Sequence, residues 1–266
     1  MKSTAAPAYT RTTNVELAAA LSVLGIEIKL DSSVDRISGQ AWKTLLIGMD
    51  SVPYEAIGAK PEEGDTMPTH QTRLILGLIR NGMLQDQDPH HPALDVLRAC
   101  KAADALKLWI KTGTEHLLAK VKGAERWVLV PGSIPQSIKS GPALFGTRDL
   151  KMATCLSVLG FPLARLEGSS PNVLFCFTGT SYTMPPAVAS DLAQMHRTKR
   201  LEEVSPEHPL LWMMQGLSNR DAIGDLMKSR APLILIRAPG TGRASLVSAN
   251  AKGRTMDRVK RHLRIP

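Results

Sequence analysis

Apolar residues recur three and four positions apart near the start of each half of this chain, which predicts a helix with one buried face in each half. The two stripes are Leu17, Ala18, Leu21 and Leu24, and Met152, Ala153, Leu156 and Leu159. Asn14 and Asp149 precede them as predicted N-caps, because their side-chain oxygens accept free backbone N–H groups. Gly25 and Gly160 follow them and suit the left-handed position past a helix end.

A shorter alternation of apolar residues follows each helix and predicts two strands and then a second helix. The expected strands are 26–30 and 44–49 in the first half, and 161–166 and 173–177 in the second. Strand 173–177 is apolar on both faces, so we expect it to be covered on both sides. The expected second helices are 71–80 and 187–196, and 52–68 is predicted to be an exposed loop.

A Pro-x-His-Pro turn comes next in both halves, 117 positions apart. Pro92 and Pro209 are expected to begin helices, since a missing N–H costs nothing in the first turn. We predict that His91 and His208 close the turns and cap these helices. Beyond them a further short helix is expected, ending at Lys111 or Lys228, and then a closing strand, 127–130 or 233–236, with a Pro-Gly turn.

These repeated elements predict an α+β fold of two tandem related modules, each a helix, two strands, two or three helices and a strand. The expected boundaries are 1–130 for the first module, 131–146 for a linker, 147–239 for the second module and 240–266 for a basic tail. The linker assignment rests on the Pro, Gly and Ser content of that segment.

The second module resembles a small uncharacterised bacterial domain family, which opens on a Thr-Asp-Leu helix and continues to a Val-x-Phe-x-Phe strand. The matching residues are Thr147, Asp149, Leu150, Ala153, Leu156, Gly160, Val173, Phe175 and Phe177, with Arg148 between Thr and Asp. The resemblance covers about a quarter of the chain. It implies a fold and no activity.

Charge is concentrated at the C-terminal end. The chain carries a net charge of +9, and residues 237–266 hold eight Lys or Arg against Asp257 alone, which is +7 of that total. Met256, Val259 and Leu263 share one face of a predicted basic helix. The predicted nucleic-acid-binding residues are Arg243, Lys252, Arg254, Arg258, Lys260, Arg261 and Arg264.

The sequence names no catalytic group, metal site or cofactor. Segment 237–244 is similar to a phosphate-binding loop, but Arg243 and Ala244 stand where Lys and Ser or Thr are needed. The histidines lack the ligand spacing of a metal site. Cys100, Cys155 and Cys176 have no paired spacing, and we expect them to be reduced core residues.

Together these features predict a non-enzymatic intracellular binding protein of bacterial or phage type. Its expected partner is nucleic acid or a nucleoprotein, contacted through the basic segment. One alternative is a phage virion structural or assembly protein, which joins copies of itself or a protein partner. A second alternative is an enzyme with an unrecognised site between modules. No apolar run is long enough to span a membrane, so a cytoplasmic location, or the virion if phage-encoded, is expected.

Overall fold

The computed structural model describes residues 9–26, 28–30, 45–48, 52–53, 66–67, 69–178, 186–205, 208–229, 233–237 and 244–248. It is an α+β protein with helices and antiparallel sheets, as the sequence predicted. The chain forms two compact units. Unit 1 contains residues 1–87, 91–93 and 215–266, and unit 2 contains residues 88–90 and 94–214.

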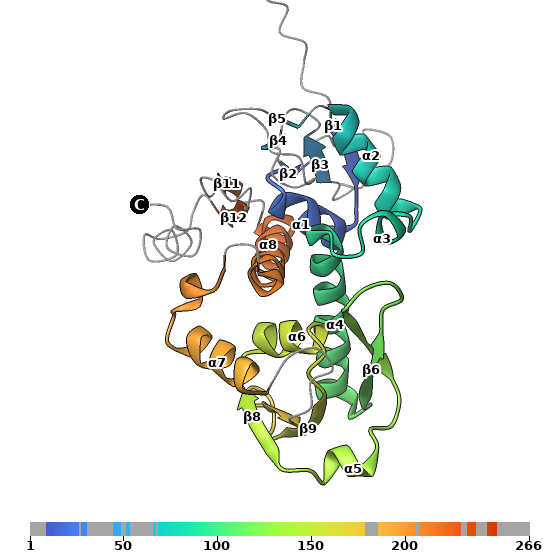
Figure 1. Cartoon of the computed structure of the whole chain (residues 1–266). Helices are drawn as coiled ribbons and strands as arrows, with labels where there is room; N and C mark the ends of the chain where they lie inside the picture. Colours follow the sequence, from blue (N-terminus) through green and yellow to red (C-terminus); the bar gives the residue numbers. More distant parts are fainter. Residues whose placement is uncertain are drawn as a thin grey trace, which may run out of the picture. The chain divides into compact units, whose positions relative to one another are not determined.

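The first half of the chain runs from strand to helix to strand and ends on a long helix and a hairpin (Figure 1). Its first elements are β1 (Tyr9–Thr12), α1 (Val15–Val23), β2 (Ile28–Leu30), β3 (Leu45–Gly48), β4 (Val52–Pro53) and β5 (Thr66–Met67). Then come α2 (Thr69–Arg80), α3 (Leu84–Gln87), α4 (Pro92–Thr112), β6 (His116–Lys120) and β7 (Trp127–Pro131).

The second half presents a closely similar series of elements. It contains α5 (Gln136–Lys139), β8 (Ala143–Thr147), α6 (Leu150–Val158), β9 (Leu163–Glu167), β10 (Leu174–Thr178) and α7 (Pro186–Arg197). The 3-10 helix η1 (Leu201–Glu203), α8 (Pro209–Ser229), β11 (Leu233–Arg237) and β12 (Ala244–Ser248) complete it. The helices α4 and α8 are both 21 residues long, and α2 and α7 are both 12.

The three-stranded sheets also have the same strand order in both halves. In the first half, β3 lies between β1 and β2, and in the second half β10 lies between β8 and β9. All four pairings are antiparallel. In the second sheet Phe145 of β8 stacks on Phe177 of β10 at a ring-centroid distance of 5.1 Å, and Phe161 meets Phe145 edge-on at 5.8 Å.

The predicted caps of the first helix in each half are confirmed. Asn14 Oδ1 accepts a hydrogen bond from the Leu17 amide at 2.9 Å, and Asp149 Oδ1 accepts one from the Met152 amide at 3.0 Å. Gly25 and Gly160 follow the helix ends with φ of +86° and +91°, a conformation that a side chain would disfavour.

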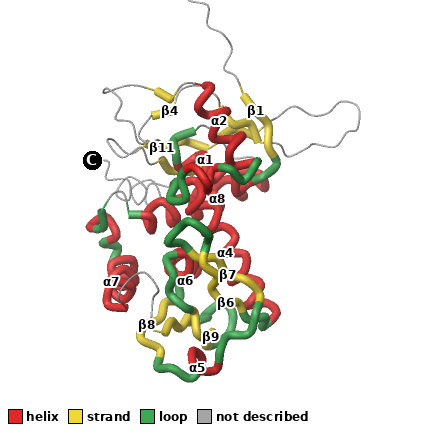
Figure 2. Tube along the Cα trace, turned by 45° about the vertical axis from the view of Figure 1, so that its right-hand side comes forward, coloured by secondary structure: helices red, strands yellow, loops and turns green. Residues whose placement is uncertain are grey.

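The composition of the units differs from the predicted module boundaries. In unit 1, the first helix of the first half packs with strand β12 and with α8 from Gln215 onward, which belong to the second half. In unit 2, α6 of the second half contacts β7 of the first half, beside which it lies in Figure 2. Each compact unit therefore joins the beginning of one half to the end of the other.

The structure also changes several predicted elements. The helices expected to begin at Pro92 and Pro209 are continuous with the further short helices expected to end at Lys111 and Lys228, in α4 and α8, because no proline interrupts either run. Strands β1, β6, β8 and β12 were not predicted. The segment expected to be a linker, 131–146, contains α5 and most of β8, and β12 lies inside the expected tail.

Among the described helices, none combines the length and the apolar character that crossing a bilayer requires. Of the loop predicted at 52–68, only β4 and β5 belong to the described part of the chain.

Candidate functional site

The seven predicted nucleic-acid-binding residues, Arg243, Lys252, Arg254, Arg258, Lys260, Arg261 and Arg264, lie outside the described residues. The basic helix predicted around Met256, Val259 and Leu263 lies outside them as well. The tail assignment therefore stays a prediction from sequence.

An exposed basic face on α4 was not singled out from the sequence. Lys101, Lys107 and Lys111 are all exposed and fall within about one third of the helix circumference at 3.6 residues per turn. Asp104 and Leu108 lie on the same face, and Leu108 is 46% exposed. The signal in the sequence was three lysines, six and four residues apart, beside a buried stripe, and the Asp and Leu residues between them obscured it.

The equivalent face of α8 has a different charge. Positions 117 residues after Lys101, Lys107 and Leu108 hold Ser218, Gly224 and Asp225, and only Lys111 has a basic counterpart, Lys228. Ser218 and Gly224 are half-buried, and Asp225 is exposed. The exposed lysines are therefore specific to α4 in unit 2, and the equivalent face of α8 does not share them.

The β6–β7 hairpin, which follows α4, adds Lys120 and Lys122, both exposed. Arg126 at the end of its turn is directed inward, where its Nε donates to Asp95 Oδ1 at 3.0 Å. Five lysines between 101 and 122 are therefore exposed in unit 2. We call Lys101, Lys107, Lys111, Lys120 and Lys122 the unit 2 lysines.

The histidines of the two Pro-x-His-Pro turns cap the following helices, as predicted. His91 Nδ1 accepts a hydrogen bond from the Ala93 amide at 3.2 Å, and His208 Nδ1 accepts one from the Leu210 amide at 3.1 Å. An accepting Nδ1 requires the imidazole to carry no proton on that nitrogen. The cap is therefore made by the neutral ring.

We expect the cap at His208 to weaken in mild acid. Burial lowers the pKa of His208 and the nearby charge of Arg126 lowers it further, whereas an unfolded histidine has a pKa of about 6.5. The stabilisation is complete above the unfolded value and is lost as pH falls through the folded value. The variant His208→Asn keeps a capping side chain without titrating. Thermal unfolding from about pH 8 to about pH 5 should show wild type losing more stability than this variant. Parallel curves would contradict the expectation.

A buried ionic cluster joins α4 to the hairpin in unit 2. Asp95 Oδ1 accepts hydrogen bonds from Arg98 Nη1 at 2.9 Å and from Arg126 Nε at 3.0 Å, and Arg98 Nη1 also donates to the Pro89 carbonyl at 2.9 Å. Burial raises the pKa of Asp95 although both guanidinium groups act to lower it. The side chains are too enclosed to receive a substrate, so the cluster serves the fold.

A contact between a histidine and an aspartate connects α7 to the start of α6. His196 Nε2 lies 3.0 Å from Asp149 Oδ2, the oxygen that the Met152 amide does not use. Burial would raise the pKa of Asp149, but the hydrogen bonds from His196 and from the helix amides lower it to about 2. In the first half, Asn14 caps the helix at the position equivalent to Asp149, so this histidine–aspartate contact belongs to unit 2.

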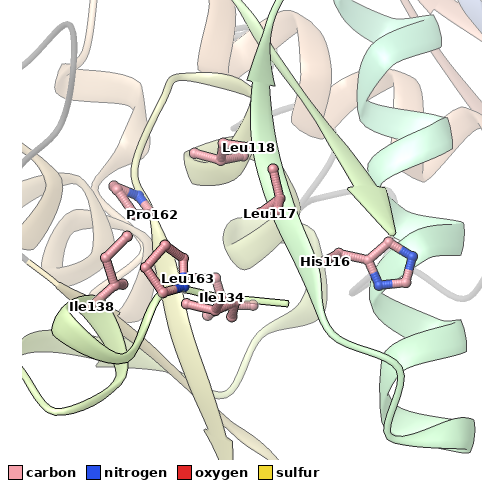
Figure 3. Close-up of a pocket in the computed structure, with 8 residues that line it drawn as sticks. His116, Leu117, Leu118, Ile134, Ile138, Pro162 and Leu163 are labelled. Atoms are coloured by element: carbon pink, nitrogen blue, oxygen red, sulfur yellow. The ribbon is translucent and has the colours of Figure 1, made fainter. Parts of the chain in front are cut away.

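A small apolar pocket lies in unit 2 between β6, α5 and β9. Its volume is about 130 Å³, and Figure 3 shows the side chains around it. Its lining residues are His116, Leu117, Leu118, Ile134, Pro135, Ile138, Pro162 and Leu163. Figure 3 shows the His116 ring turned away from the other labelled side chains. Its Nδ1 lies 2.9 Å from the Thr114 carbonyl oxygen. The pocket therefore brings together no acid and base.

The three cysteines are buried and free, as predicted. Burial raises the pKa of the Cys155 thiol well above its ordinary value, which keeps it protonated and unreactive. Within the described part of the chain, no group of His, Cys, Asp or Glu side chains is arranged to hold a metal ion.

The chain matches no protein-family model, no curated protein and no solved structure.

Proposed function

We propose that the protein is a non-enzymatic binding protein that engages nucleic acid, alone or in a nucleoprotein, through the basic segment 237–266. The observation that carries the proposal is the +7 charge of those thirty residues, against +2 for the rest of the chain. Neutralising phosphates with Lys and Arg releases condensed counterions, which favours binding without sequence specificity.

The unit 2 lysines support the same proposal as a second set of exposed basic side chains. On α4, Lys107 and Lys111 have no hydrogen-bond or ion-pair partner among the described residues, so their ammonium groups are available to a phosphate. Lysine contacts a phosphate as a point charge, and a phosphate contact carries no sequence information. Exposed aromatic side chains do not accompany them in the described part of the chain, which favours backbone contacts over base stacking.

The test is a titration of the full chain with duplex DNA, single-stranded DNA and RNA at several salt concentrations. Binding should weaken steeply with salt, by about 0.9 logarithmic units per phosphate contact for each tenfold rise. Replacing Arg254, Arg258, Lys260, Arg261 and Arg264 with Gln should weaken binding at least about tenfold and flatten the salt dependence.

Two matched variants test whether the lysines of α4 contribute to affinity beyond the effect of the net charge of the protein. Lys107→Gln with Lys111→Gln should reduce affinity further, whereas Lys228→Gln on the equivalent face of α8 should change it little. Absence of binding at low salt, or equal affinity after the five tail substitutions, would contradict the proposal.

We also propose that the two halves arose by tandem duplication. The matched helix lengths, sheet orders, N-caps and His-Pro turns support this origin. The bounds of α4, β6 and β7 recur 117 residues later in α8, β11 and β12 without a shift. The first half carries 18 more residues than the second between its first helix and its second, where β4 and β5 lie.

The assembly alternative has one observation in its favour. Strand β8 lies at the edge of its sheet, and Leu144 on it is 53% exposed. An edge strand with an exposed apolar side chain can pair with another chain. Light scattering over a concentration series distinguishes the two: an assembly protein forms a larger particle without nucleic acid, and a binding protein stays at one mass.

A further inference from the structure

The core of unit 1 is built from both halves of the chain. Asn219 of α8 donates through Nδ2 to Ser22 Oγ of α1 at 2.8 Å, with both side chains fully buried. The side-chain oxygen of Asn219, Oδ1, accepts hydrogen bonds from the Leu246 amide and from Gln215 Nε2. Asn219 thus connects α8 and the β11–β12 hairpin, which we call the helix–hairpin of the second half, to the first helix of the first half.

An ion pair joins the same two helices at their surface. Arg220 Nη2 lies 3.5 Å from Glu16 Oε1, with both side chains partly exposed. In unit 2 the positions equivalent to Glu16 and Arg220 hold Lys151 and Ala103. If each half packed its helix–hairpin against its own first helix, Arg220 would face Lys151, and two like charges would meet. In the observed structure α8 packs against the first helix of the other half, so Arg220 lies beside the Glu16 carboxylate instead.

In unit 2 the two halves also pack against each other's elements, but without an ion pair equivalent to Glu16–Arg220. There α6 of the second half contacts β7 of the first half, and Ala102, the counterpart of Asn219, is buried. Ser157, the counterpart of Ser22, donates to the Ala153 carbonyl of its own helix at 2.9 Å, as Ser22 does to the Ala19 carbonyl at 2.8 Å, but no asparagine faces it. The hydrogen-bonding groups of the two interfaces therefore differ.

We propose that the two halves of the chain are specific binding partners for each other, each presenting its first helix to the helix–hairpin element of the other half. The occupant of the α1 surface is α8 with β11 and β12, recognised through Ser22–Asn219 and Glu16–Arg220. The occupant of the α6 surface is α4 with β6 and β7. Neither half contains a complete core, so we expect the two halves to stay associated when the covalent connection between them is cut.

The experiment uses the intact protein with a protease site inserted between Ser140 and Gly141. After cleavage of the folded protein, fragments 1–140 and 141–266 should co-elute in equal amounts and keep the circular dichroism spectrum of the uncut protein. Elution of the two fragments as separate species in native buffer, folded or unfolded, would overturn the proposal.

Charge reversal tests the specificity in the same cleaved protein. Glu16→Arg and Arg220→Glu alone should each weaken fragment association about threefold, and the double variant should restore it to within about twofold. Lys151→Gln is the comparison variant: it removes the like charge that Arg220 would meet in a self-packed half, so it should not strengthen association of the fragments. A gain in association with Lys151→Gln, or no rescue in the double variant, would overturn the assignment.

Discussion

The variant Asp95→Ala is expected to destabilise unit 2 by about 3–5 kcal/mol, because it leaves two enclosed guanidinium groups without a counter-charge. Asp95 is 2% exposed, and its Oδ1 receives hydrogen bonds from both Arg98 and Arg126. Removing one partner of such a cluster costs more than the cluster contributes, since the remaining charges stay out of water. Denaturant unfolding monitored by circular dichroism measures the loss.

Two further variants locate the origin of that effect. Asp104→Ala, on the exposed face of the same helix, should change stability by about 1 kcal/mol or less, because interactions of an exposed carboxylate contribute little. Asp95→Asn keeps the shape and one acceptor, so an intermediate loss is expected if charge and hydrogen bonding both contribute. A cost below about 1 kcal/mol for Asp95→Ala would show that water reaches the two arginines and that the cluster is not enclosed.

The sequence predicted local structure well wherever one residue determines it. The caps at Asn14, Asp149, His91 and His208 follow from side-chain acceptors beside an apolar run, and all four were found. Strand β8 was missed because its pairing partner, β10, lies about thirty residues away, and a Pro- and Gly-rich segment precedes it. Local composition carries no information about such a partner.

The exchange of elements between halves could not be read from the sequence for a related reason. A hydrophobic stripe on α1 specifies that the helix is covered and leaves open whether α4 or α8 covers it. The choice depends on pairs far apart in the chain, such as Glu16 with Arg220 and Ser22 with Asn219. The buried cluster around Asp95 was missed similarly, since Arg126 reaches it from a different element.

The variants Leu21→Ala and Leu156→Ala are each expected to cost about 2–5 kcal/mol, since each leaves a cavity in a core as well as removing apolar contact. Both leucines are fully buried, at matching positions of α1 and α6. Their burial was predicted from the apolar stripes of the two helices. The composition of the two units predicts which segments of the chain each substitution destabilises.

Leu21→Ala should increase amide hydrogen exchange in α1 and also in α8 beyond Gln215 and in β12, which share its unit although they lie about two hundred residues away. Leu156→Ala should instead expose amides of α6, of α4 beyond Leu94 and of the β6–β7 hairpin. Exchange measured by mass spectrometry distinguishes these patterns, because local opening exposes the members of one cooperative unit together. If Leu21→Ala raised exchange in α4 and β7 and left α8 and β12 protected, each half would be folding on itself. The opposite pattern is the one that a chain with exchanged halves must give.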